Sequence, residues 1–199
     1  MEPADRPRSS SPKELEDREL VRRLVERDPE ALAELYDRHA SMLLALAQRV
    51  LGSREEAEEV VQEALLQIWS QAARYDPDRS SVSTWMVLIA RSRAIDRLRS
   101  RKVIERTTVA VQREEIATHA SPEGASAVLR YERGLRLRVE LEQLPEEQRD
   151  VLERAFFQGM TQREIAERTG IPLGTVKTRT LLAMKKLRAA LRHDLETLL

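Results

Sequence analysis

The sequence predicts an all-α protein made of two small helical domains joined by a flexible linker. Charged residues make up 34% of the 199 residues and aromatic residues only 4%, a composition that favours helices packed through aliphatic side chains. Apolar residues recur at the spacing of three and four that helices require over most of the chain. The pattern lapses over residues 103–127, which include the turn-forming Ser121-Pro122-Glu123-Gly124. We therefore expect a tail at 1–13, domains at 14–102 and 128–199, and a linker at 103–127, in which Arg113–Thr118 is a candidate short helix.

The segment Thr161–Arg188 has the pattern of a helix-turn-helix. Thr161 followed by Glu164 is a capping box, which predicts the start of a helix. Gly170 suits the left-handed position that ends a helix, and Pro172 suits the first turn of the next one. A preceding helix is expected at 145–158, closed by Gly159, with Val151, Leu152, Ala155 and Phe156 packed on the helix-turn-helix.

The second helix of this motif is strongly basic. Residues 173–192 hold six basic side chains and no acidic one. We expect Val176, Leu181 and Leu182 to form its buried side, and Thr175, Lys177, Thr178 and Arg179 to lie on its outer side. A cationic helix behind a tight turn is typical of proteins that insert a helix into the DNA major groove. The alternative is an ordinary helical hairpin with a solvated basic face.

Helix-start signals also divide the first domain. We expect a helix at about 14–27 and a second one opened by Asp28-Pro29 and closed by Gly52. Ser53 and Glu56 form another capping box, which predicts a helix over about 54–74. The apolar residues of the first helix are Leu15, Leu20, Leu24 and Val25, and those of the third are Ala57, Val60, Val61, Leu65 (or Ala64), Ile68 and Trp69.

Charge is segregated within this domain. Residues 54–63 contain five glutamates against the single Arg54, and acidic residues in a first turn favour the helix dipole. That explanation covers Glu55 and Glu56 better than the later glutamates. A polar loop at 76–84 precedes a predicted helix at 85–102, whose apolar residues are Trp85, Leu88, Ile89, Ile95 and Leu98. Residues 91–106 carry a net charge of +5, a second cationic element.

Composition excludes several classes of function. The chain has no cysteine, so it forms no disulfide and no thiol-ligated zinc site. Its formal net charge is zero, so affinity for nucleic acid depends on local charge. We expect a cytoplasmic protein, since no run is apolar enough for a membrane span or a signal peptide. The three histidines, His39, His119 and His193, are scattered, and no phosphate-binding glycine loop is present. We therefore expect neither an enzyme nor a bound cofactor or metal.

These blocks together resemble the extracytoplasmic-function (ECF) class of bacterial sigma factors, which are two-domain initiation factors of RNA polymerase. The resemblance covers nearly all of residues 20–192. It is carried by AEEVVQEALLQIW at 57–69, STWMVLIARSRAIDRLR at 83–99 and LEQLPEEQRDVLERAFFQGMTQREIAERTGIPLGTVKTRTLLAMKKLR at 141–188. It implies that residues 14–102 form a region 2-like domain and residues 128–199 a region 4-like domain.

The resemblance also implies site residues. Those that dock on a coiled coil of the largest polymerase subunit are Glu58, Glu59, Gln62 and Glu63. Those that hold the opened −10 element are Ser80, Ser81, Ser83 and Thr84 at a base pocket, and Arg91, Arg93, Asp96, Arg97 and Arg101 along the strand. Those that read the −35 element are Thr161, Thr175, Lys177, Thr178, Arg179 and Lys185. Trp85 is an alternative base-stacking residue, although we assign it to the core.

The implied partners are core RNA polymerase, promoter DNA and an anti-sigma protein, with no insertion of this chain into a membrane. The alternative from another class is a free-standing helix-turn-helix regulator. Such a protein shares the basic recognition helix but needs neither an acidic docking helix nor a melting loop. Binding to core polymerase without DNA discriminates between the two.

Overall fold

The computed structural model describes residues 11–107 and 139–196, which contain helices and turns but no strand. The chain divides into two compact units, Met1–Thr118 and His119–Leu199. The candidate helix at 113–118 and the start of the second helical pattern near residue 127 lie outside the described residues.

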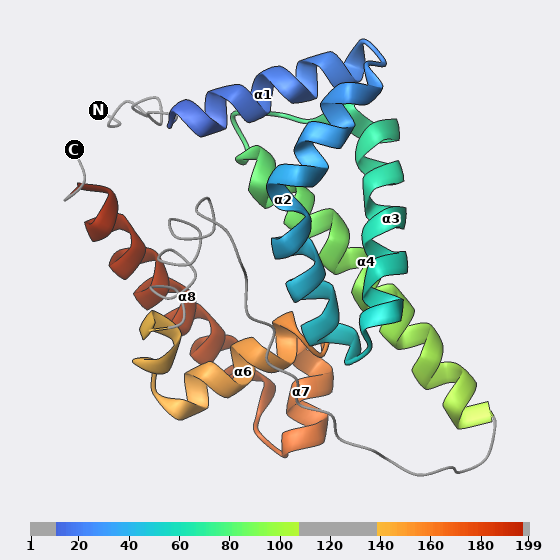
Figure 1. Cartoon of the computed structure of the whole chain (residues 1–199). Coiled ribbons are helices and arrows are strands. Elements are labelled where there is room, and N and C mark those ends of the chain that lie inside the picture. Colours follow the sequence, from blue (N-terminus) through green and yellow to red (C-terminus); the bar gives the residue numbers. More distant parts are fainter. Residues whose placement is uncertain (1–10, 108–138, 197–199) are drawn as a thin grey trace. The chain divides into compact units, whose positions relative to one another are not determined.

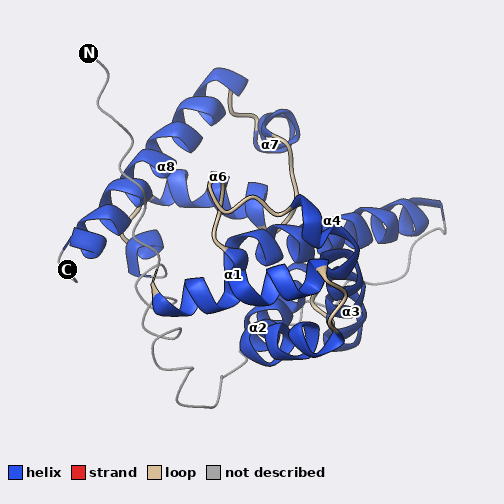
Figure 2. Ribbon diagram, turned by 90° about the horizontal axis from the view of Figure 1, so that it is seen from above, coloured by secondary structure: helices blue, strands red, loops and turns tan. Residues whose placement is uncertain are grey.

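The described part of the first unit, residues 11–107, is a bundle of four helices (Figure 1). They are α1 (Pro12–Val25), α2 (Pro29–Leu51), α3 (Arg54–Gln71) and α4 (Val82–Thr107), with a short 3-10 turn, η1 (Ala72–Arg74), after α3. Helices α2, α3 and α4 pack on one another, and α1 lies across one end of them. Helix α4 is longer than expected at both ends, and its last turns project beyond α2 and α3 (Figures 1 and 2).

Local capping chemistry starts and ends these helices. Ser11 Oγ accepts from Glu14 N at 3.3 Å, so α1 begins at Pro12, inside the segment expected to be a tail. Asp28 Oδ1 accepts from Glu30 N at 2.9 Å, and Gly52 ends α2 in the left-handed region with φ 76°. These caps satisfy backbone groups that a helix end leaves unpaired.

The third predicted start uses its acidic residue differently. Ser53 Oγ accepts from Glu56 N at 3.3 Å, as in a capping box. The Glu56 carboxylate, however, accepts from Arg101 of α4 at 2.9 Å. The helix proper ends at Gln71 and tightens into η1, so the expected end at residue 74 includes this 3-10 turn.

The core of the first unit is aliphatic and draws on all four helices. Its largest fully buried side chains are Leu24, Leu35, Leu43, Val60, Val61, Ile68, Val82 and Met86. Leu15, Val25 and Leu88, which were expected to make apolar contacts, are exposed instead, and so is Tyr36 of α2. Val21 and Ala90 are buried on the same helices. The presence of large apolar side chains predicts that a helix has a buried face, but it does not determine which face meets the bundle.

A buried polar pair also joins α1 to α2. Asp17 Oδ2 and His39 Nε2 lie 2.9 Å apart, and both side chains are buried. Arg38 Nη1 donates to Asp17 Oδ1 at 3.1 Å, so both carboxylate oxygens have partners. Because a buried charge without partners is costly, this network fixes how α1 sits on α2.

The second unit contains the helix-turn-helix. Its helices include α6 (Glu146–Phe156), α7 (Gln162–Thr169) and α8 (Leu173–Glu196). The capping box at Thr161 is complete, since Glu164 N donates to Thr161 Oγ1 and Thr161 N donates to the Glu164 carboxylate. Gly170 ends α7 with φ 70°. Pro172 stands one position before α8 rather than inside its first turn.

Two small apolar clusters hold this unit together. Val151, Ile165 and Val176 bring α6, α7 and α8 together, with Ala155 and Ala166 packed against them. Leu144, Ala183 and Leu187 form the other, with Leu152 packed against it.

The expected buried side of the second helix is therefore wrong in part. Val176 is fully buried, but Leu181 is 69% exposed and Leu182 is 42% exposed. Val176, Ala183 and Leu187 follow one helical face at spacings of seven and four, which places Leu181 and Leu182 elsewhere on the helix.

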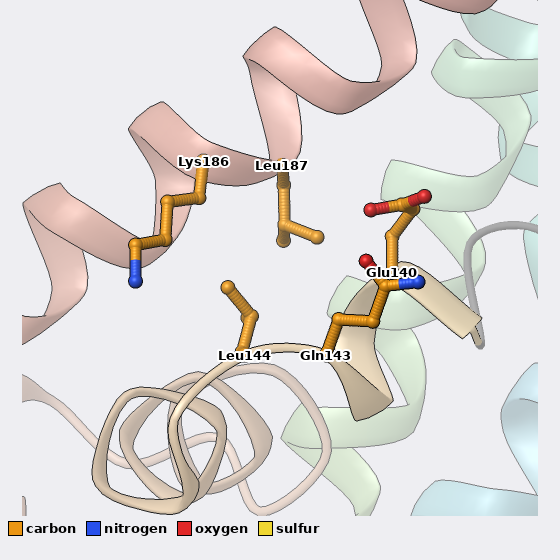
Figure 3. A pocket seen from close by; sticks show the side chains of 5 residues that line it. All are labelled: Glu140, Gln143, Leu144, Lys186 and Leu187. Atoms are coloured by element: carbon orange, nitrogen blue, oxygen red, sulfur yellow. The ribbon is translucent and has the colours of Figure 1, made fainter.

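A pocket of about 110 Å³ lies beside the second cluster (Figure 3). Its lining residues are Glu140, Gln143, Leu144, Lys186 and Leu187. The side chains of Leu144 and Leu187 point toward each other across it (Figure 3). None of the predicted site residues lines this pocket.

Candidate functional sites

The acidic face of α3 meets the basic face of α4. Arg97 spans two carboxylates, with Nη1 2.8 Å from Glu59 Oε2 and Nη2 2.9 Å from Glu63 Oε1. Arg93 Nε donates to Gln67 Oε1 at 2.6 Å, and its Nη1 lies 3.8 Å from Glu63. The structure thus joins residues expected to bind polymerase with residues expected to bind DNA.

These pairs give the glutamates beyond the first turn of α3 an intramolecular role. Hydrogen bonds from Arg97 to Glu59, the largest cause, and to Glu63 raise the pKa of the guanidinium. Glu58 pairs within α3, with Arg54 Nε 2.9 Å from its Oε1. Gln62 is exposed on the same helix. All four side chains therefore remain at least partly accessible to a partner.

The remaining candidates on α4, Arg91, Asp96 and Arg101, lie in different surroundings. Arg101 Nη1 donates to Leu51 O at 3.2 Å and to Glu56 Oε2 at 2.9 Å, tying α4 to the junction of α2 and α3. Burial, and then the neighbouring charge of Arg99, lower the pKa of Arg91. Asp96 is exposed.

The four hydroxyl residues expected to line a base pocket do not share one environment. Helix α4 begins at Val82, so Ser83 and Thr84 lie in its first turn rather than in a loop. Ser81 is the capping residue, since its Oγ accepts from Thr84 N at 3.2 Å and donates to Thr84 Oγ1 at 2.9 Å. Ser83 Oγ instead lies 3.8 Å from Met42 Sδ of α2. The structure therefore joins Ser81 to Thr84, whereas Ser83 faces α2 and Ser80 lies in the loop before the helix.

Aromatic side chains flank this segment. The Tyr75 and Trp85 rings lie 5.2 Å apart at 46°. Trp85 is half-buried, so the expected core placement holds for only part of its surface. Tyr75 Oη donates to Ser80 O at 2.9 Å, which closes the loop between η1 and α4. Burial raises the pKa of Tyr75 to about 12.

The helix-turn-helix presents its candidates unequally. Lys177, Thr178 and Lys185 are exposed on α8, and Thr175 is half-buried. Thr178 Oγ1 donates to Gly174 O at 2.9 Å, and Thr161 is occupied as the cap of α7. Because Lys177 and Lys185 are two helical turns apart, they share one outward face.

Arg179 is not on that open face. Its Nη2 lies 2.5 Å from Glu147 Oε2 of α6, and its side chain is 24% exposed. The expectation that it lies on the outer side is therefore only partly met. Sequence reasoning missed Glu147 because an acidic first turn of α6 is already accounted for by the helix dipole.

Comparison with known proteins decides between the sequence alternatives. Residues 35–103 match the family model for sigma-70 region 2, and residues 134–187 match the model for sigma-70 region 4. The chain is 37% identical over 164 residues to the ECF RNA polymerase sigma factor RpoE of Cereibacter sphaeroides, covering 81% of this chain and 87% of that protein. This chain belongs to the ECF RNA polymerase sigma factors.

Other ECF sigma factors are similar along nearly the same length. SigK of Mycobacterium bovis is 31% identical over 172 residues, which cover 86% of this chain and 91% of that protein. Among solved structures, Rhodobacter sphaeroides SigE in complex with the anti-sigma ChrR is 32% identical with a TM-score of 0.45, covering 91% and 99% of the two chains.

The matched segments of this sigma factor contain the candidate residues described above. The region 2 match includes α3 and most of α4, and the region 4 match includes α6, α7 and much of α8. Among the described residues, no helix is long and apolar enough to cross a membrane.

Proposed function

We propose that this sigma factor binds core RNA polymerase and directs promoter-specific transcription initiation. The observation that carries the proposal is the presence of both family regions, in order, on one chain. The exposed acidic side of α3 and the outward basic side of α8 support it, since they suit different partners. Sigma factors are not known as enzymes, and we assign no catalytic step to this chain.

In this proposal, Glu58, Glu59, Gln62 and Glu63 contact the polymerase. Glu59 is 63% exposed although it pairs with Arg97, so most of its side chain is accessible to a basic partner surface. Complementary charge across an interface favours encounter and disfavours wrong partners. We place the protein in the cytoplasm because core polymerase and promoter DNA are there.

The −10 and −35 roles are assigned to separate units. Ser80, Ser81 and Thr84, with the arginines of α4, hold the opened −10 strand; Ser83 contributes by packing on α2. The −35 duplex is contacted by the exposed candidates of α8, which are Lys177, Thr178 and Lys185. Bases of a melted strand are held by close pockets and by phosphate contacts, which the hydroxyl groups and arginines at the start of α4 and along it offer.

An anti-sigma protein is part of the proposal. R. sphaeroides SigE, 32% identical to this chain, was solved in complex with the anti-sigma ChrR. Lacking cysteine, this sigma factor has no thiol of its own with which to sense redox change. We infer that an inducing signal acts on such a partner rather than on this chain.

A pull-down without DNA tests the proposal against a free-standing regulator. Wild-type protein is expected to bind core polymerase, and Glu59→Lys with Gln62→Ala is expected to bind it at least tenfold more weakly, since like charges at an interface cost several kcal/mol. Glu19→Lys on α1 is the matched control, because Glu19 is exposed and pairs only locally with Arg22. A wild-type chain that binds promoter DNA but not core polymerase contradicts the proposal.

A further inference from the structure

One carboxylate of α1 binds the backbone at the start of α4. Glu14 Oε1 accepts from Val82 N at 3.1 Å, and these residues are 68 positions apart in the chain. The same oxygen lies 3.4 Å from Tyr75 Oη and 3.2 Å from Arg18 Nε. The Glu14 side chain is only 15% exposed, so this arrangement is partly shielded from water.

Val82 N is a backbone donor that α4 itself leaves unpaired. The first N–H groups of a helix have no acceptor within it, and a negative charge near them is favourable. Ser81 Oγ serves Thr84 N, and Glu14 serves Val82 N. Helix α4 is therefore capped both by its own sequence and by a residue of α1.

The loop before α4 is tied to the same helix. Arg18 Nη2, one turn after Glu14, lies 3.4 Å from Pro77 O. Tyr75 Oη has a single proton, which goes to the nearer Ser80 O at 2.9 Å and leaves the Glu14 contact as a longer one. Glu14 and Arg18, one turn apart on α1, thus contact the segment before α4 at two points, Val82 N and Pro77 O.

We propose that Glu14 is a positioning residue for promoter opening, and this inference rests on the proposed function. Its carboxylate fixes the start of α4, beside the hydrogen-bonded hydroxyls of Ser81 and Thr84 that the proposed function assigns to the base pocket. A base pocket must be formed before a base is flipped, because the cost of unstacking is repaid only by groups already in place. Helix α1 therefore contributes to melting without touching DNA.

The variants that test it are Glu14→Ala, Glu14→Gln and Glu19→Ala. Glu14→Ala removes the acceptor, while Glu14→Gln keeps an oxygen that Val82 N can use. Glu19→Ala is the matched control, since it removes an exposed carboxylate from the same helix. Glu14→Ala also removes the contact between Glu14 and Arg18 within α1. The thermal unfolding of this variant and its affinity for core polymerase are therefore measured as well.

Amide hydrogen exchange of the folded chain is the first measurement. The Val82 amide is expected to exchange about tenfold or more faster in Glu14→Ala than in wild type, in line with loss of a hydrogen bond to a charged acceptor. Glu14→Gln is expected to fall between them and Glu19→Ala to match wild type. Unchanged exchange at Val82 in Glu14→Ala overturns the capping role.

The second measurement is permanganate footprinting of a promoter that the wild-type chain opens with core polymerase. Glu14→Ala is expected to lower thymine reactivity on duplex DNA severalfold while core affinity stays within twofold, and a pre-melted promoter is expected to restore part of the signal. Opening equal to wild type, or equal loss in Glu19→Ala, overturns the inference alone. A wild-type chain that opens no promoter overturns the proposed function, and this inference with it.

Discussion

Arg97 of α4 is bound to Glu63 of α3, with Nη2 2.9 Å from Oε1. Arg97 is proposed to hold the −10 strand and Glu63 to contact polymerase. In the free chain, each side chain therefore binds the other instead of its proposed partner. The side chains are 31% and 43% exposed, so the pair is open to solvent and weak enough to exchange. Exposed pairs of this kind contribute about 0.2–1 kcal/mol.

The pair predicts a gain of function in the isolated chain. Glu63→Gln is expected to raise its affinity for single-stranded −10 DNA by about 1.5- to 5-fold, the equivalent of that coupling energy, because Arg97 loses a competing partner. The salt dependence is expected to steepen, since more counterions are released. Fluorescence anisotropy measures both. Glu58→Gln is the control, because it makes the same charge change at a residue paired with Arg54; an equal gain in that variant refutes the pairing explanation.

A similar competition is expected on the helix-turn-helix. Arg179 has the planar fork that suits guanine, but Glu147 holds it at 2.5 Å. If Arg179 reads a base, Arg179→Ala costs about 1–3 kcal/mol and relaxes preference at one position, whereas Lys177→Ala weakens all sequences alike. Glu147→Gln is expected to strengthen −35 binding modestly. Binding assays on single-base variants of a mapped promoter test this, and an Arg179→Ala variant with unchanged affinity and preference excludes base reading.

The buried face of α8 predicts a contrast between two leucines. Leu187 is 8% exposed within an apolar cluster, whereas Leu181 is 69% exposed. Leu187→Ala is expected to lower the free energy of unfolding of the second unit by about 2–5 kcal/mol, and Leu181→Ala to change it by less than about 0.5 kcal/mol. Chemical denaturation followed by circular dichroism measures both. Similar losses in the two variants contradict this packing.

Tyr75 predicts a pH dependence at the alkaline end. Burial raises its pKa to about 12 from the ordinary 10.0, so folding favours the neutral phenol. The resulting stabilisation is fully present below the unfolded pKa and is lost as pH rises from about 10 to 12. Tyr75→Phe is expected to show a shallower loss of stability over that window. Denaturation midpoints at stepped pH decide it, and parallel curves for the two proteins contradict the assignment.

Local signals made much of the fold predictable. Ser53, Asp28 and Thr161 start helices through their own side chains, and Gly52 and Gly170 end them through backbone conformations that glycine tolerates. Each depends on a few neighbouring residues, so a single sequence contains it.

Contacts between helices were harder to predict. Glu56, Glu59 and Glu63 meet Arg101, Arg97 and Arg93 in reverse order, as neighbouring antiparallel helices require. That reversed spacing is present in the sequence, but it identifies a pair only once α3 and α4 are known to be neighbours. The Glu14–Val82 contact involves a backbone donor, so no pattern of side chains signals it.

Promoter opening that depends on both core polymerase and this chain tests the central claim most directly. Transcript starts are first mapped by run-off transcription of genomic DNA with core polymerase, and a mapped promoter is then footprinted with permanganate. We predict reactive thymines near the start site only when core polymerase and the sigma factor are both present, with reactivity reduced by Arg93→Ala with Arg97→Ala. Promoter binding by the chain alone, with no opening and no transcript when core polymerase is added, contradicts the account.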